Sequence, residues 1–295
     1  MKSDDVPTLD VEPRLLREWP LPQPDGGADK EARGSTLVIA GSAEMPGAAC
    51  LAATSALRAG AGKMAVATVA GIAPGVALLL AEARVLALAQ TDAGGIGAEA
   101  MSQIESRLAK VDAVLIGPGL LDGAATRSFT RRILKRATRA AVVIDALAMD
   151  VVLDVRRFER APLLTPHAGE MAHLTGLAKD EIDADPERHA REAALRWNAV
   201  VALKGSITYI ATPEGDCWRH ASSQVGLGTS GSGDALAGII VGLAARGAPL
   251  AQAAVWGVAL HARAGRALAE RMGPLGYLAR ELPAEIPALM DKLAH

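Results

Sequence analysis

Aromatic residues, cysteines and a dominant charge are scarce in this sequence. Of its 295 residues only 3% are aromatic, so a hydrophobic core must be built from Ala, Leu, Val and Ile. The two cysteines, Cys50 and Cys217, lie far apart and form no CxxC pair, which argues against a disulfide scaffold or a zinc ribbon. The formal net charge of −2 provides no general attraction to nucleic acid or to an acidic membrane.

Segments that would direct the chain into a membrane are also missing. The first residues, MKSDDVPTLDVEPR, are polar and acidic, unlike a signal peptide. The longest apolar run, residues 235–245, is well short of the ~20 residues that a membrane span needs. We interpret Gly238 and Gly242 in this run as close-packing positions of a buried helix rather than as a transmembrane dimer motif. We therefore expect a cytoplasmic protein that binds neither membranes nor nucleic acid.

Short apolar runs alternate with segments of helical period from residue 35 onward. The apolar runs predict strands covered on both faces, at residues 36–40, 64–69, 113–117, 141–145, 162–165 and 199–205. The periodic segments predict helices at residues 47–60, 98–110, 123–137 and 187–198. Two strand-like runs within residues 207–220 flank Pro-Glu-Gly-Asp, which indicates a hairpin. The sequence thus predicts an α/β fold in which a central, mainly parallel sheet has helices on both faces.

The ends of the chain differ from this regular middle part. Residues 1–33 are predicted to be a lead-in arm, and the Pro- and Gly-rich stretch 20–34 to be a loop. Residues 34–295 are predicted to form one catalytic domain, since no second boundary is visible. After Gly233 the chain is expected to be helical, with breaks near Gly273–Pro274, Pro283 and Pro287.

Five of the predicted strands lead into loops of unusual composition. In open α/β sheets ligands bind outside the carboxyl ends of the strands, so these loops should meet at one edge of the sheet. They comprise residues 40–49, 116–123, 144–150, 164–170 and 203–208. Their convergence predicts a ligand site at that edge.

The stretch GTSGSGDALAGII carries an acid between glycines and an apolar helix. Gly228, Gly231 and Gly233 permit tight turns and a close approach of backbone N–H groups to an anion, which the positive end of the helix also favours. Asp234 would repel a phosphate, so its chemical role would be to take a proton from a hydroxyl beside one. The competing interpretation is that Asp234 or Ser232 caps the helix. The stretch alone leaves both interpretations open.

Other polar residues at this edge allow two interpretations each. His167 can hydrogen-bond a phosphate, an amide or a hydroxyl, or serve only the structure. Lys204 can meet a phosphate or simply be solvated. Asp145 can orient a ligand or a hydrated Mg²⁺, or cap the next short helix. The turn at Gly47 can admit a bulky ligand or be an ordinary strand–helix connection. His173 is interpreted as structural, the basic run 131–139 as a solvated face, and the remaining histidines show no metal-ligand spacing, so no protein-bound metal is predicted.

The order of these motifs resembles one known family. GSxxxPGAAxLAAxxALRAGAG begins at Gly41 and is followed by GPGL (117–120), IDA (144–146), LTPHxGE (164–170), LKGxxT (203–208) and GSGDxLAGII (231–240). The sequence is similar in this respect to the ADP- or ATP-dependent (S)-NAD(P)H-hydrate dehydratases of the ribokinase-like superfamily, over about residues 30–295. The resemblance implies a three-layer ribokinase-like fold.

The resemblance also implies a repair reaction. A nucleoside phosphate phosphorylates the added hydroxyl of the S epimer of hydrated NADH or NADPH, phosphate leaves, and the dihydropyridine ring is restored. Bacterial members of the family typically use ADP and release AMP. Mg²⁺ would be held chiefly by phosphates and water. A cytoplasmic homotetramer is expected on the same ground.

Site residues follow from the matching motifs. The resemblance implies that Asp234 activates the hydroxyl and that Gly231, Ser232 and Gly233 surround the moving phosphoryl group. It places hydrated NAD(P)H at Gly47, Ala48, Gly119, His167 and Asp234, and the adenine nucleotide at Lys204, Gly205, Ser206, Ile207, Thr208 and Gly233.

Some features depart from the family pattern and leave rival functions open. Leu121 stands where members often have a further glycine after GPGL, and residues 224–229 keep only part of the usual sequence. The roughly 30 residues ahead of the first strand are too few for a fused epimerase domain, so an epimerase would be a separate protein. A small-molecule kinase of the same superfamily, for a hydroxyethylthiazole or a hydroxymethylpyrimidine, is the first rival. A nucleotide-binding scaffold or sensor without turnover is the second.

Overall fold

The computed structural model describes residues 6–23, 30–222 and 224–294, and within them ten strands form one sheet. The strand order is β1-β10-β9-β8-β7-β6-β5-β2-β3-β4. All neighbouring pairs from β8 to β4 are parallel, whereas β9 is antiparallel to β8 and to β10. The predicted mainly parallel sheet is therefore confirmed, and the predicted hairpin, β9–β10, lies near one end of it, inside β1.

The elements have the following bounds. The strands are β1 Thr8–Asp10, β2 Ser35–Ile39, β3 Lys63–Val69, β4 Ala83–Leu88, β5 Ala113–Ile116, β6 Ala141–Ile144, β7 Leu163–Leu164, β8 Val200–Leu203, β9 Ile207–Ala211 and β10 Cys217–Ala221. The α-helices are α1 Pro13–Glu18, α2 Pro46–Arg58, α3 Ala73–Leu79, α4 Ala100–Leu108, α5 Gly123–Arg136, α6 Ala168–Thr175, α7 Lys179–Ala184, α8 Pro186–Trp197, α9 Ser232–Ala245, α10 Leu250–Met272 and α11 Leu282–Ala294. Three 3₁₀ helices are η2 Ala146–Leu153, η3 Val225–Leu227 and η4 Ala279–Glu281.

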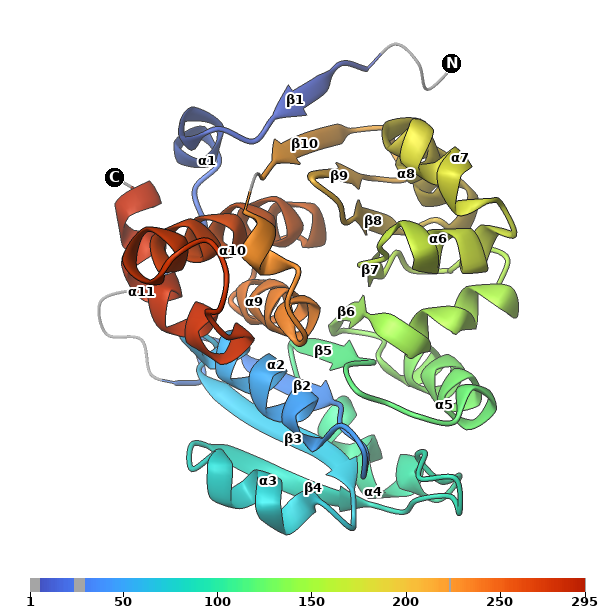
Figure 1. Cartoon of the computed structure of the whole chain (residues 1–295). Coiled ribbons are helices and arrows are strands. Elements are labelled where there is room, and N and C mark those ends of the chain that lie inside the picture. The colour runs from blue at the N-terminus through green and yellow to red at the C-terminus, as the bar shows by residue number, and fades with distance from the viewer. Residues whose placement is uncertain (1–5, 24–29, 223, 295) are drawn as a thin grey trace.

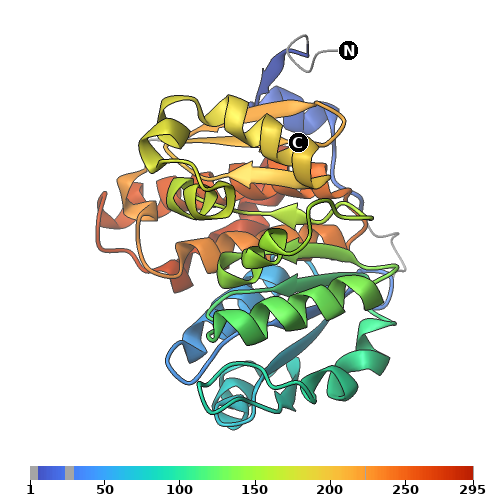
Figure 2. The same ribbon diagram turned by 90° about the vertical axis from the view of Figure 1, so that its right-hand side faces the viewer.

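Helices cover both faces of the sheet, as Figures 1 and 2 show. Helices α2, α9, α10 and α11 lie on one face, and their buried residues form a core with Val38, Leu115 and Ile210 of the sheet. Helices α4, α5, α6 and α8 lie on the other face, where they pack on Ile39, Val114 and other strand residues whose side chains point to that face. Alternate residues of a strand face opposite sides, so continuously apolar strands supply both cores. This three-layer arrangement is the predicted ribokinase-like architecture.

Close packing of helix α9 on helix α2 depends on two glycines. A Cβ atom on Gly238 would lie 2.3 Å from the backbone oxygen of Ala52, and one on Gly242 would lie 2.4 Å from that of Ala56. Side chains at these positions would force the helices apart. The interpretation of Gly238 and Gly242 as packing positions of a buried helix is confirmed, and no helix among the described residues has the length and hydropathy to cross a membrane.

Two strands were not predicted, and both lie at the sheet's ends. Strand β4 pairs with β3, and its residues are mostly half-buried or exposed, as is usual at an edge. Strand β1, within the predicted lead-in arm, pairs with β10, and helix α1 buries Leu16 in the core. The described part of the arm is thus packed on the domain, while residues 24–29 of the predicted loop 20–34 lie outside the described residues.

The predicted breaks in the C-terminal helices are only partly right. The chain does leave helical structure at Gly273–Pro274, but helix α11 runs through Pro283 and Pro287. Pro283 is the second residue of α11, where its missing N–H costs nothing. The helix tolerates Pro287 further inside, so the prediction of a break there is wrong.

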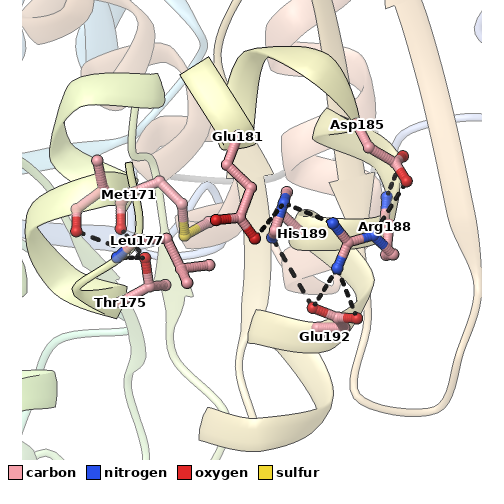
Figure 3. A network of polar contacts seen from close by, with 9 residues as sticks. Met171, Thr175, Leu177, Glu181, Asp185, Arg188, His189 and Glu192 are labelled. Atoms are coloured by element: carbon pink, nitrogen blue, oxygen red, sulfur yellow. Dashed lines mark hydrogen bonds and ion pairs between the residues drawn. The ribbon is translucent and has the colours of Figure 1, made fainter. Parts of the chain in front are cut away.

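Polar contacts around His189 explain why this histidine is buried. Its ring lies 3.0 Å from Arg188 Nη2, 3.8 Å from Glu192 and 4.0 Å from Glu181. Figure 3 shows these side chains meeting between helices α7 and α8. His189 is a satisfied structural histidine.

In the basic run 131–139, Arg136 forms an ion pair with Glu105 and Arg132 donates to the Ala98 carbonyl, so part of that face ties α5 to the α4 region.

Candidate active site

The loops after β2, β5, β6, β7 and β8 meet at the carboxyl edge of the sheet, as predicted. The Gly41 N–H donates to the Pro118 carbonyl, and the Lys204 N–H donates to that of Pro166. Gly117 lies so close to the next loop that a Cβ atom would stand 1.8 Å from the Asp145 carbonyl oxygen. Its φ of 134° is also one that a side chain disfavours. Sequence-distant motifs thus form one site.

Asp145 is the buried centre of this edge, with 3% of its surface exposed. Its Oδ1 accepts a hydrogen bond from Thr165 Oγ1 at 2.6 Å and lies 3.5 Å from Lys204 Nζ. It makes no side-chain cap to η2, so the capping interpretation of Asp145 is wrong. The next residue, Ala146, adopts a left-handed φ of 49°, and such backbone strain is concentrated at functional sites.

Lys204 is a cation held by two carboxylates. Its Nζ lies 3.5 Å from Asp145 and 3.7 Å from Glu170. Burial lowers the pKa of Lys204, but the neighbouring carboxylates of Asp145 and Glu170 outweigh this, so the pKa is raised overall. Lys204 is therefore charged and fixed in place. The alternative interpretation, that it is simply solvated, is wrong.

Neither Ser232 nor Asp234 caps helix α9. The N-cap is Gly231, whose φ of 85° is left-handed, and it makes no side-chain cap. Ser232 Oγ instead lies 3.0 Å from His261 Nε2 of helix α10. Asp234 occupies the third position of the helix. The capping interpretation is wrong for both residues, which leaves the Asp234 carboxylate available for chemistry at the positive end of α9.

The environment of Asp234 brings the pKa of its carboxyl group close to neutral pH. Burial raises its pKa to about 6, and the negative charge of Asp145 adds to the rise, while the Lys204 ammonium opposes it. A carboxylate with such a pKa can accept a proton in neutral solution and can also return it. Asp234 is thus suited to act as a general base.

The first turn of α9 and Lys204 form an anion site together. Lys204 Nζ lies 3.6 Å from the position that a Cβ atom on Gly233 would take. The ammonium is therefore beside the backbone at the start of the helix, where partial positive charge gathers. This pair of positive features suits a phosphoryl group next to Asp234.

A cavity of about 630 Å³ opens on one side of this turn. Of the residues predicted to bind a nucleotide, Lys204, Gly205, Ser206, Thr208 and Gly233 line it, and His167 does so too. Ile207 is exposed between two of them and does not line the cavity. Lining residues that sequence reasoning missed include His220, Ser222, Gln224, Leu236, Val258 and His261. They come from β10, the following loop and helices α9 and α10, and apart from Leu236 they lie outside the quoted motifs.

His167 is positioned by its own helix. It is the N-cap of α6, where its Nδ1 accepts the N–H groups of Gly169 and Glu170 at 3.0 and 3.1 Å. Glu170 returns a bond to the His167 N–H at 2.7 Å, which completes a capping box. Because Nδ1 is an acceptor, the neutral ring carries its proton on Nε2, and that N–H can donate to a ligand. The structural and the binding interpretations of His167 are therefore compatible.

Ala48 and Gly119 lie together at the other side of the site. A Cβ atom on Gly119 would be 2.6 Å from Ala48 Cβ and 2.9 Å from the Met45 carbonyl. Gly47, by contrast, has open space beside it. Leu121, the departure from the GPGL-glycine pattern, precedes Asp122, which caps helix α5 through Ala125 N–H. Gly47 and Ala48 lie in the first turn of α2 and Gly119 in the loop after β5, whereas His167 and Asp234, also predicted to bind the hydrate, lie at the starts of α6 and α9.

The described residues contain no cluster of three or more side chains that could hold a metal ion. The Asp145 carboxylate, the natural candidate, is already engaged by Thr165 and Lys204. The donor set therefore suits a Mg²⁺ ion that arrives with phosphate oxygens and water, as Mg²⁺ commonly does.

Comparisons with known proteins find matches along most of the chain. Residues 36–288 match the family model described as NAD(P)H-hydrate dehydratase. The chain is 45% identical over 283 residues to an ADP-dependent (S)-NAD(P)H-hydrate dehydratase from Xanthomonas campestris pathovar campestris, with 94% of each protein covered. It is 37% identical to a bifunctional NAD(P)H-hydrate repair enzyme from Moorella thermoacetica, which it covers over 52% of its length.

A solved structure is similar throughout. The ADP/ATP-dependent NAD(P)H-hydrate dehydratase from Bacillus subtilis, co-crystallised with ATP and Mg²⁺, superimposes with a TM-score of 0.82 at 28% identity. The match covers 97% of this chain and 99% of that one. The similarity therefore extends over nearly the whole fold.

Proposed function

This chain belongs to the NAD(P)H-hydrate dehydratase family, and from that premise we propose that it restores NADH or NADPH from the S epimer of the hydrated cofactor. ADP is the proposed phosphoryl donor, as in the name of the Xanthomonas relative, with ATP as the alternative that the Bacillus relative's name allows. The products are the reduced cofactor, phosphate and AMP, or ADP when ATP is used.

The observation that carries the proposal is the environment of Asp234. Its carboxylate has a pKa of about 6, stands in the first turn of α9, and has the Lys204 ammonium as a neighbour. A base and a phosphate-binding terminus in one turn of helix are what phosphoryl transfer to a hydroxyl requires.

The reaction then runs in two stages. Asp234 takes the proton of the ring hydroxyl while the hydroxyl oxygen attacks the terminal phosphorus of ADP. AMP leaves with the bridging oxygen. In the second stage the carbon–oxygen bond to the ring breaks, phosphate departs with that electron pair, and the ring loses a proton to regain its double bond. Gly231, Ser232 and Gly233 surround the moving group, with Lys204 offsetting its charge.

The two substrates are proposed to meet at Asp234 and at His167, which lines the nucleotide cavity although the resemblance assigns it to the hydrated cofactor. The cavity lined by Lys204, Gly205, Ser206, Thr208 and Gly233 is the proposed nucleotide site, with Ile207 at its rim. The hydrated nicotinamide is proposed to contact Gly47, Ala48, Gly119, His167 and Asp234. Mg²⁺ would be held chiefly by the nucleotide's phosphate oxygens and water, and it would offset the phosphate charge.

The direct test incubates the protein with hydrated NADH, ADP and Mg²⁺. We expect the absorbance of reduced nicotinamide to return, with one phosphate and one AMP for each NADH. A phosphorylated nicotinamide product that accumulates would instead indicate a small-molecule kinase. No recovery with either ADP or ATP would contradict the proposal, and nucleotide binding without any turnover would favour the sensor alternative.

Further expectations follow from the same resemblance. We propose that residues 34–295 form the catalytic domain, that the protein is a cytoplasmic homotetramer, and that a separate epimerase converts the R epimer. Sedimentation of the purified chain tests the tetramer.

A further inference from the structure

Two residues that line the nucleotide cavity each carry a buried polar atom with no partner among the described residues. These residues are His220 and Ser222, on or just after strand β10, and the buried atoms without a partner are their Nδ1 and Oγ. Buried polar groups are almost always hydrogen-bonded, so each such atom calls for an explanation. In a ligand cavity the simplest explanation is that the ligand supplies the partner.

The sheet places these atoms at a defined distance from the phosphate end of the cavity. Leu203 of β8 pairs with Tyr209 of β9, so the next residue, Lys204, stands level with Thr208. Thr208 in turn pairs with His220 of β10. Neighbouring strands are about 4.8 Å apart, so His220 is about 10 Å across the sheet from Lys204.

A nucleotide can span this row of residues. If its terminal phosphate lies between Lys204 and Gly233, the rest of the molecule extends over Thr208 towards His220. Ser222 shares the face of His220, since side chains two residues apart in a strand point the same way, and its N–H donates to the Ser206 carbonyl. Both orphaned atoms therefore lie where the nucleoside, rather than the phosphates, would be.

The charge state of His220 suits a neutral partner. Burial, together with the positive charges of Arg263 and Arg266, lowers its pKa to about 4. The neutral ring has one donor and one acceptor nitrogen, and the serine hydroxyl can do both. Sugar hydroxyls and the polar edge of a base offer matching groups.

We propose that His220 and Ser222 form the hydrogen-bonding floor that recognises the nucleoside of the phosphoryl donor. The inference rests on the proposed function only in taking the cavity as the nucleotide site. It assigns nucleoside selectivity to β10, outside all the motifs by which the family is recognised.

The experiment measures direct binding by calorimetry, so it needs no turnover. ADP, 2′-deoxy-ADP and UDP are titrated into the wild-type protein, His220→Leu, His220→Asn and Ser222→Ala. Thr212→Val is the matched control, because Thr212 Oγ1 is also buried without a described partner on this hairpin but does not line the cavity. Hydrated-NADH turnover is recorded separately.

We expect His220→Leu to weaken ADP binding about tenfold and Ser222→Ala about fivefold, as loss of one buried hydrogen bond does. His220→Asn should recover part of the loss, and Thr212→Val should change affinity less than twofold. If these residues contact the base, the preference for ADP over UDP should be smaller in the variants. If they contact the sugar, the preference for ADP over 2′-deoxy-ADP should be smaller.

Unchanged ADP affinity in both cavity variants, or an equal loss for all three nucleotides, would overturn the inference. Failure of the proposed function has a different signature, namely ADP binding that depends on His220 in a protein that never restores NADH.

Discussion

The first turn of helix α9 and the turns that follow it use glycine for opposite purposes. Gly233 leaves the backbone at the helix start open beside Lys204, and Gly231 supplies the left-handed turn ahead of Asp234. Gly238 and Gly242 bring the backbone of α9 against that of α2. The start of α9 thus leaves room for a ligand, whereas the rest of the helix packs directly against α2.

This difference separates function from stability within one element. The first turn holds the half-buried Asp234 carboxylate, whose pKa is raised to about 6 by burial and further by the charge of Asp145, an arrangement that is unfavourable for folding. The later turns are buried and apolar from Ala235 onward and pack on α2 and α10. The packed turns hold in place a terminus whose charges would not assemble by themselves. Substitutions in the two parts should therefore have separable effects.

Asp234→Asn should have the largest effect. We expect turnover of hydrated NADH to fall about 1,000-fold, because the amide cannot accept the hydroxyl proton. ADP binding and the thermal midpoint should be retained, since Asn removes a carboxylate that is costly to ionise in this position. Steady-state kinetics, calorimetry and thermal unfolding check the three quantities. A variant with more than a tenth of the activity, or one that is unfolded, would erase the distinction between the two parts of α9.

Gly238→Val should have the opposite effect to Asp234→Asn, since it should lower the stability of the fold rather than act on the chemical step. Its side chain would collide with the backbone of Ala52, and overpacking of this kind costs about 3 kcal/mol of the free energy of unfolding. The matched control is Gly75→Val in helix α3, where a Cβ atom meets nothing within 4 Å. Denaturant titration should show a loss for Gly238→Val that is at least twice that for Gly75→Val. Equal losses would mean that the contact of α9 with α2 does not determine stability.

Lys204→Met and Asp145→Asn should have smaller and opposite effects on the acidity of Asp234. The Lys204 ammonium lowers the pKa of Asp234 and Asp145 raises it. The acidic limb of the pH–rate profile should therefore move up by roughly one unit in Lys204→Met and down by a similar amount in Asp145→Asn. Residual activity over a range of pH provides the measurement. Shifts in the same direction would show that the three charges do not act on one another as their positions imply.

Most of the fold was predictable because buried parallel strands have an unmistakable composition. The six apolar runs became β2, β3, β5, β6, β7 and β8, and the Pro-Glu-Gly-Asp turn became the β9–β10 hairpin. Strand β4 was missed because Ala83–Leu88 closely follows the apolar helix α3, so the two merge into one run. Strand β1 was missed because a strand of three residues has no measurable period. Such edge elements are fixed by their pairing partners.

The site was predictable where motifs mark backbone geometry, and less so where side chains meet. The loops with GPGL, TPHAGE, KGSIT and GSGD converge as expected from the topology of the sheet. The pairing of Lys204 with Asp145, 59 residues apart, was not foreseeable, and neither was the choice between cap and base at Asp234. His220 escaped notice since nothing in its local sequence marks it, and only the sheet register places it opposite Thr208.

The pH dependence of kcat/KM for hydrated NADH in the wild-type protein tests the central claim, that Asp234 is the base, most directly. Protonated Asp234 cannot accept the hydroxyl proton, and its pKa of about 6 lies far above that of an ordinary aspartate. The account predicts that kcat/KM is constant in neutral solution and falls tenfold for each pH unit below about 6. A profile that stays flat down to about pH 4 would contradict it.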